Sequence, residues 1–156
     1  MEKEKKMKHK KLFTGAGFVL VLVLISVISV QAAGPKTLYL DWRQVVPADT
    51  GDPNMFGEAT VDVNAGQARL CYTLRVFLYP ATDWPPKGAS IHRAPSGSNG
   101  PLVADLGSDF SLDTTNGCVN ISSALAHDIQ RNPVQYYLLI TDASHPEGAA
   151  RVQLAK

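Results

Sequence analysis

Three of the residues whose side chains can bind a metal ion are the candidates for a site in this sequence: His92, Asp142 and His145. His92 ends a short apolar segment and precedes a turn rich in Pro, Ser and Gly, whereas His145 lies in a Ser-His-Pro turn just after Asp142. Imidazole nitrogens and carboxylate oxygens are ligands that proteins offer to zinc and copper. Folding could join the three residues into one site, which would reach only the lower end of the three or four protein ligands that zinc and copper normally take.

His92 also has a structural interpretation, in which its ring bonds to a backbone group or a hydroxyl at the end of a strand. In that role it would hold the turn at Arg93–Gly100 in place. We favour this interpretation because a single histidine supplies too few ligands for zinc or copper. The sequence therefore predicts no cofactor and no metal, and His92, His145 and Asp142 are the candidate ligands if a metal does bind.

The sequence contains no pattern of residues typical of nucleophilic catalysis. The Gly-x-Ser-x-Gly turn that presents a serine nucleophile is absent from the sequence. Acidic residues that flank the same turns could form a glycosidase pair, but loops collect polar side chains without any catalytic role. We expect no catalytic residue and no enzyme activity.

Arg151 is expected to form a partly buried salt bridge with Asp142 or Glu147, or else to contact a partner.

The first 32 residues have the features of a secretory signal peptide. A lysine-rich start precedes an apolar run at 12–30, and small residues follow it up to Ala32. We expect cleavage after Ala32, which leaves residues 33–156 as a single domain. The alternative is an uncleaved membrane anchor, because the run is close to the ~18 residues that span a bilayer. In either case the domain is expected to be secreted or extracytoplasmic, at the cell surface.

The charge of the chain argues against nucleic acid as a partner. Six of the 15 Lys and Arg residues lie in the leader, against two of the 14 Asp and Glu residues, so the rest of the chain is net acidic. The remaining basic residues are scattered singly, without the cluster that neutralises phosphates. The expected partner is an unidentified protein or cell-surface ligand, and a membrane only if the leader is retained.

Two cysteines, Cys71 and Cys118, are expected to form a disulfide. An even count in an exported chain favours pairing, because the compartments outside the cytoplasm are oxidising. Zinc would require further ligands at close spacing, and a nucleophilic cysteine would require a basic partner.

The rest of the sequence has the pattern of a β-protein. Residues 67–78 alternate between apolar and polar side chains, with Leu70, Tyr72 and Leu74 on one face, which is typical of a strand with one side on a core. Residues 57–64 alternate too, and the turn between the two segments predicts an antiparallel hairpin. Other strands are expected at 37–46, 89–93, 102–106, 117–121, 136–141 and 149–154.

One short helix is expected near residues 122–132. Leu125 and Ile129 are four positions apart, a serine can cap the start and Pro133 ends the segment. We expect this helix to cover an open end of the β-structure. Short strands at regular intervals predict an all-β, antiparallel Greek-key sandwich or barrel with one short helix.

Several motifs in this order resemble the CHRD domain, a module named after chordin. They are Leu-Cys-Tyr, Ile-His, Gly-Pro-Leu-Val, Gly-Cys, Asn-Pro, Tyr-Tyr and Arg-x-Gln-Leu, and they extend over about residues 36–155. The resemblance implies an immunoglobulin-like or superoxide-dismutase-like antiparallel fold. It covers nearly everything after the leader, so we expect a single CHRD-like β-domain.

The chain departs from the family where histidines are usual. Members typically carry His-x-His before the glycine turn and often another histidine after Tyr-Tyr, whereas this chain has Ser90 and Thr141 there. We therefore expect an exported, non-enzymatic β-module with a binding or structural role. The alternative is a copper- or zinc-binding, dismutase-like protein that uses His92 and His145.

Overall fold

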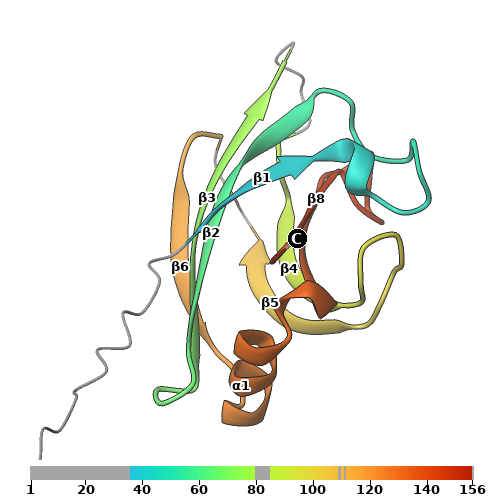
Figure 1. Ribbon diagram of the computed structural model, residues 1–156. Helices are drawn as coiled ribbons and strands as arrows, with labels where there is room; N and C mark the ends of the chain where they lie inside the picture. The colour runs from blue at the N-terminus through green and yellow to red at the C-terminus, as the bar shows by residue number, and fades with distance from the viewer. Residues whose placement is uncertain (1–35, 80–84, 109, 111, 156) are drawn as a thin grey trace, which may run out of the picture. The chain divides into compact units, whose positions relative to one another are not determined.

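Eight β-strands and one α-helix make up the described part of the chain, which covers residues 36–79, 85–108, 110 and 112–155 of the computed structural model (Figure 1). The predicted leader at 1–32 lies outside these residues. The strands are β1 (Thr37–Asp41), β2 (Met55–Asn64), β3 (Arg69–Leu78), β4 (Gly88–Arg93), β5 (Leu102–Ser108), β6 (Thr115–Asn120), β7 (Tyr136–Thr141) and β8 (Ala150–Gln153). The helix α1 is Ser123–Arg131, and two short 3-10 turns, η1 (Trp42–Gln44) and η2 (Pro133–Gln135), complete the list. Within the described ranges, no helix has the length and apolarity needed to cross a membrane.

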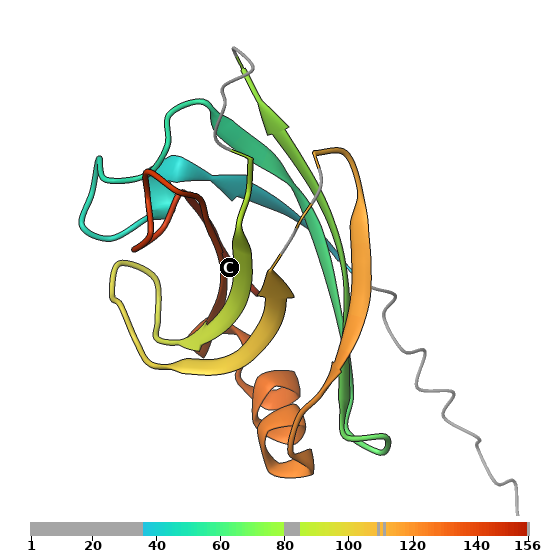
Figure 2. The same cartoon turned by 180° about the vertical axis from the view of Figure 1, so that it is seen from behind.

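All eight strands belong to one sheet, in the order β5-β4-β7-β8-β1-β2-β3-β6, and every paired neighbour is antiparallel. The sheet curls until its two edge strands approach each other, which makes a nearly closed barrel (Figures 1 and 2). The Tyr72 hydroxyl on β3, next to edge strand β6, donates a 2.7 Å hydrogen bond to the carbonyl of Leu106 on the other edge strand, β5. The predicted all-β antiparallel class is confirmed.

Alternation along β3 places its apolar face inside the barrel. Leu70, Tyr72, Leu74 and Val76 are all buried in the main core. The same residues pair across the sheet with β2, in a register that joins Val61 to Tyr72, so the predicted hairpin is confirmed. A strand with one face on a core and one face outward is what a period of two residues requires.

The helix closes one end of the barrel, below the strands in Figure 1. It begins after Ser122, whose hydroxyl accepts a 3.1 Å hydrogen bond from the Leu125 amide, and it ends before Pro133. Ala126 and Ile129 are its buried residues, and Ile129 belongs to the main core. The predicted helix and its position at an open end are confirmed.

The first strand is shorter than the expected 37–46, because the chain turns at residue 41. The Asp41 carboxylate accepts a 2.9 Å hydrogen bond from the Arg43 amide and starts η1 there. A side chain that caps a turn in this way competes with continued strand pairing. Apolar Val45 and Val46 therefore lie in a loop, with Val45 buried.

Strands β7 and β8 are buried on both faces. Tyr136, Leu138 and Ile140 of β7 face the main core, whereas Tyr137 and Leu139 face outward and are 2% and 8% exposed. The outer side is covered by three loops, at residues 45–54, 94–101 and 142–149, which lie on the same side of the barrel in both views (Figures 1 and 2). We call the surface that these three loops form the loop face.

Candidate functional site: the loop face

His92 on β4 is bonded through both ring nitrogens. Its Nδ1 donates to the Gly100 carbonyl at 2.9 Å, and because a carbonyl only accepts, this nitrogen carries the proton of the neutral ring. Its Nε2 then accepts from the Ser90 hydroxyl, also at 2.9 Å. The ring stacks on Tyr137, with 5.2 Å between centroids. In this arrangement His92 ties β4 to the end of the 94–101 loop.

Ser90 supplies a hydroxyl at the position where the resemblance to the CHRD domain implies a second histidine. It is two residues from His92 on the same strand, so both side chains point to the same side. The Ser90 hydroxyl occupies the nitrogen that a metal would otherwise use. The structure thus gives His92 a hydrogen-bonded, loop-holding environment.

Arg151 on β8 is buried beneath the same loop, with 1% of its surface exposed. Its guanidinium donates to the carbonyls of Ser98 and Pro95, at 3.0 and 3.1 Å, and lies 3.5 Å from the centroid of the Tyr137 ring. Burial lowers the pKa of Arg151 from its usual value.

The expected salt bridge of Arg151 to Asp142 or Glu147 is wrong. Within the described residues, Arg151 forms no ion pair with either carboxylate. Asp142 instead accepts hydrogen bonds from its own turn, and Glu147 is exposed. The Arg151 side chain projects from the outer face of β8 toward the 94–101 loop. It therefore points away from both carboxylates.

Gln153 continues this pattern two residues further along β8. Its side-chain amide donates to the carbonyls of Ala94 and Val134, at 2.8 and 2.7 Å, and its own carbonyl oxygen accepts from Arg151 at 3.3 Å. Residues i and i+2 of a strand share a face, so Arg-x-Gln places both donors under the loop. The two side chains together bind three carbonyls of the 94–101 loop.

The loop is also attached at its far end. The Gly100 amide donates to the Tyr137 hydroxyl at 3.2 Å, and the Asn99 side chain donates to the Val46 carbonyl of the neighbouring loop at 2.7 Å. Residues 95–99 nevertheless remain exposed. The loop is therefore held from below through its backbone, while its tip faces solvent.

A second group of polar side chains lies between the other two loops. Asp52 and Asp142 are 4% and 3% exposed, and their carboxylates lie with a ring nitrogen of His145 within 4.8 Å of one another. Asp142 and His145 are close in sequence, and Nδ1 of His145 lies 3.1 Å from each Asp142 oxygen. Asp52 was not among the candidates from the sequence, where it is only one polar residue of a loop rich in Pro and Gly.

His92 does not join this group. The β4–β7 register pairs His92 with Tyr137 at one end of β7, whereas Asp142 follows Thr141 at the other end. Five residues along a strand correspond to about 16 Å. The structure therefore brings Asp142 and His145 together and keeps His92 apart from both.

The two cysteines lie on another part of the barrel. Cys71 on β3 and Cys118 on β6 are directly opposite each other in the sheet and form a disulfide. The predicted pairing is confirmed. Both residues are on the outer face of their strands, so the bond fastens edge strand β6 from outside and takes no part in the loop face.

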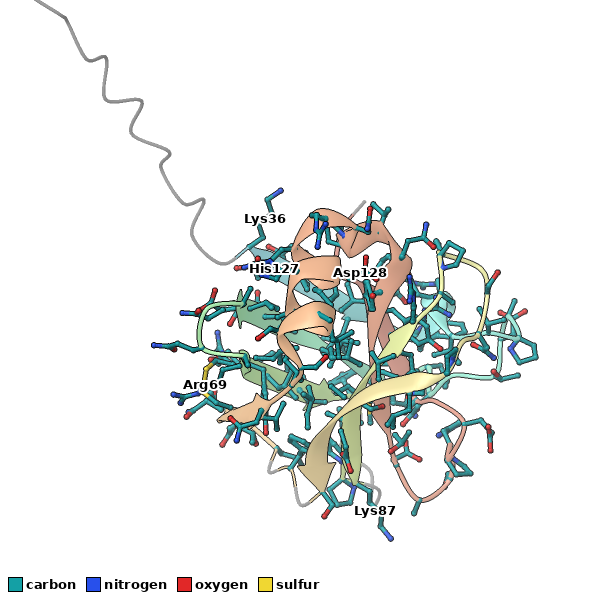
Figure 3. The ribbon with its side chains drawn as sticks, turned by 90° about the horizontal axis from the view of Figure 1, so that it is seen from below. Lys36, Arg69, Lys87, His127 and Asp128 are labelled. Carbon is teal, nitrogen blue, oxygen red and sulfur yellow. A yellow bond between two sulfur atoms is a disulfide. The ribbon has the colours of Figure 1, made fainter. Side chains whose placement is uncertain are left out.

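Helix α1 is attached to the barrel by Asp128. This carboxylate accepts a 2.5 Å hydrogen bond from the Tyr136 hydroxyl and pairs with Arg93 at 3.0 Å. The hydrogen bond from Tyr136 lowers the pKa of Asp128, whereas burial, assisted by the same bond, raises the pKa of Tyr136 to about 12. The exposed His127 precedes Asp128 and lies on another side of the helix (Figure 3). Asp128, Tyr136 and Arg93 dock the helix and do not form part of the loop face.

The residues that hold the 94–101 loop are those of the motifs Ile-His, Tyr-Tyr and Arg-x-Gln-Leu. A family model described as the CHRD domain matches residues 37–154, which is most of the chain. The chain belongs to the CHRD domain family. A search of curated proteins and a search of solved structures found no match. In this CHRD domain, motifs that are far apart in sequence meet at one loop, and the family membership indicates a β-module with a binding or structural role.

Proposed function

We propose that this CHRD domain is an exported, non-enzymatic module that binds a protein or other ligand outside the cell through the loop face. The observation that carries the proposal is the 94–101 loop, whose backbone is held by Arg151 and Gln153 while residues 95–99 stay exposed. The exposed tip offers the hydroxyl groups of Ser96 and Ser98 and the side-chain oxygen of Asn99, whose amide nitrogen donates to Val46.

A loop held in this way favours recognition because binding does not have to order it. Fixing the backbone of a flexible residue costs about 1–2 kcal/mol, and this cost reduces the affinity of a mobile loop. Here the ordering has already taken place on folding. Recognition loops on a rigid β-scaffold are a common solution to the same requirement.

The polar groups under the loop support binding rather than catalysis. Both nitrogens of His92 have protein partners, and Arg151 is buried against carbonyls and an aromatic ring. A general base or an electrophile has to reach the reacting group of a substrate. Neither side chain is free to do so in this arrangement.

Export is supported by two independent features of the chain. The first 32 residues have the charge and hydropathy pattern of a signal peptide. The Cys71–Cys118 disulfide is the type of bond that persists in an oxidising compartment. Both features fit a domain that works outside the cytoplasm.

Site-specific photocrosslinking in the producing cells tests the proposed function. A photoreactive amino acid replaces Ser96 at the loop tip, and the matched control carries it at Gln67, which is exposed in the β2–β3 turn. We expect a discrete adduct from position 96 and none from position 67. The adduct should weaken when Arg151→Met loosens the loop, while circular dichroism still shows a folded protein. No adduct at position 96, or equal adducts at both positions, would contradict the proposal.

A further inference from the structure

The group formed by Asp52, Asp142 and His145 has an unbalanced charge. The two carboxylates belong to residues that are 4% and 3% exposed, and no Lys or Arg of the described residues forms an ion pair with either of them. Two like charges this close repel strongly when water is largely excluded. His145 can supply at most one positive charge, so the group retains a negative charge in any state with both carboxylates ionised.

The carboxylate of Asp52 is also short of hydrogen-bond donors. Its Oδ1 accepts from the Asn54 amide at 2.9 Å, which is a local turn contact, and no donor of the described residues reaches Oδ2. Asp142 differs, since its Oδ1 accepts from the amides of Ser144 and His145 and its Oδ2 lies near the His145 ring. A buried carboxylate oxygen without a donor is costly, and a bound cation commonly offsets that cost.

The two loops that carry these residues are joined by their backbones. The Asp52 amide donates to the Ala149 carbonyl at 2.9 Å, and the Gly148 amide closes the 142–149 turn on the His145 carbonyl at 3.1 Å. Gly51 has no room for a side chain, because a Cβ there would lie 2.6 Å from the Trp42 carbonyl and 2.8 Å from that of Ala149. Asp52 and Asp142 therefore face each other because of the fold.

We propose that Asp52, Asp142 and His145 form a binding site for a first-row divalent metal ion of the zinc type. Two carboxylate oxygens and one imidazole nitrogen are three ligands of a tetrahedral site, and water or a ligand atom supplies the fourth. The imidazole favours such a metal over calcium or magnesium, which prefer oxygen alone. The ion takes the place of the contact between His145 Nδ1 and Asp142, and the ring nitrogen that binds it must be unprotonated.

A metal at this place would act on the loop face. It would connect the 45–54 loop to the 142–149 loop, and the first of these also receives the hydrogen bond from Asn99 of the third loop. The ion would attract the carboxylates of Asp52 and Asp142, which repel each other in its absence. It would stabilise the domain in proportion to the logarithm of its concentration over its Kd, because the unfolded chain does not assemble the three ligands.

The test uses tag-free protein in its exported, disulfide-bonded form, stripped with a chelator and then titrated with Zn²⁺ by calorimetry and by thermal unfolding. We expect a one-to-one complex and a Tm that rises with Zn²⁺ concentration. Asp52→Asn should weaken the affinity by about tenfold or more, since even the loss of a supporting group costs 10–100-fold. His145→Gln should do the same. Asp49→Asn in the same loop and His127→Gln on α1, both exposed, are the matched controls and should bind as the natural sequence does.

The stability of the zinc-free variants gives a second test, which separates the loss of a ligand from a general loss of folding. Asp52→Asn preserves the oxygen that accepts from Asn54 and removes one of the repelling charges, so without zinc it should be at least as stable as the natural chain. Zinc that binds Asp52→Asn and His145→Gln as tightly as the natural protein would overturn the proposal. So would the absence of saturable zinc binding, or equal stabilisation by Ca²⁺ or Mg²⁺.

Discussion

At the scale of single residues, the stability of the loop face depends on the buried guanidinium of Arg151, which has no carboxylate partner among the described residues. Arg151 has three carbonyl-type acceptors and the face of Tyr137, but no carboxylate among the described residues. Hydrogen bonds from a charged donor are worth more than neutral ones, and a cation over an aromatic face adds about 2 kcal/mol when it is desolvated. These contacts together replace the hydration that the guanidinium loses.

Arg151→Met should therefore destabilise the domain although methionine is apolar and of similar length. The change leaves the Ser98 carbonyl without a donor and the Pro95 carbonyl with the Ser98 amide alone. We expect a loss of about 2–4 kcal/mol in the free energy of unfolding, measured with urea. Arg75→Met on the outer face of β3 is the control. Its ion pair with Glu58 is exposed, so the change should stay within about 0.5 kcal/mol. Equal effects of the two substitutions would contradict this role of Arg151.

The candidate residues show what could be read from the sequence at this scale. Asp142 and His145 are three residues apart in one turn, so their proximity was predictable from local geometry alone. Asp52 comes from a loop ninety residues earlier, and only the path of β1 and β8 places it beside them. The partners of Arg151 were missed for the same reason, because backbone carbonyls carry no signal in the sequence.

At the scale of secondary-structure elements, the strongest patterns were the most predictive. The alternation of β3 and the doubly apolar β7 correspond to a strand with one buried face and a strand buried on both. The cap and the terminating proline located α1 to within one residue. The weaker point was the end of β1, where one capping contact from Asp41 outweighed the β-branched residues that follow.

The disulfide should contribute mainly by holding β6 at the edge of the sheet. In the chain-entropy model, closing a loop of this size stabilises by about 3–4 kcal/mol. The double variant Cys71→Ala/Cys118→Ala should lose about this amount in urea unfolding, and reduction of the natural protein should have the same effect. Denatured, unreduced protein should contain no free thiol, and two free thiols would contradict the pairing.

The contact between α1 and β7 should make stability fall in alkaline solution. The pKa of Tyr136 is raised to about 12 in the folded chain, so its neutral form is stabilised fully below the unfolded value near 10, and this contribution is lost as the pH rises through 12. Tyr136→Phe should lack that part of the alkaline decline. Urea midpoints measured from neutral to strongly alkaline pH give the comparison, and identical slopes would contradict the assignment.

The same contact has the opposite sign in acid. Asp128 has a lowered pKa in the folded chain, so its contribution is present above the unfolded value of about 4 and is lost as the pH falls through the lower folded value. Asp128→Asn should remove this part of the acid dependence of the urea midpoint. An unchanged acid slope would show that the carboxylate does not dock the helix.

At the scale of the whole molecule, the order of the strands could not be derived from the sequence. The sheet pairs β4 with β7 and β1 with β8, which are far apart along the chain, and local patterns contain no information about such pairings. The family resemblance implied the same antiparallel β-fold that the spacing of the short strands predicts, and neither of them gave the order of the strands. The structure shows what three of the family motifs do: the residues of Ile-His, Tyr-Tyr and Arg-x-Gln-Leu hold the 94–101 loop.

Export is the prediction that belongs to the complete chain. N-terminal sequencing of protein recovered outside the cytoplasm should begin at Ala33 or Gly34, because cleavage is expected after the small residues at the end of the leader. Recovery of the intact Met1 end with the membrane fraction would instead indicate a retained anchor.

The most direct test of this account is backbone hydrogen exchange in the 94–101 loop. The amide of Ser98 donates to Pro95 and that of Gly100 donates to Tyr137, so both should exchange slowly in the natural protein although the tip is exposed. In Arg151→Met both should exchange much faster, while amides shared by β2 and β3 keep their protection. Loop amides that exchange at the unprotected rate in the natural protein would contradict the claim that buried motif residues hold this loop ready for binding.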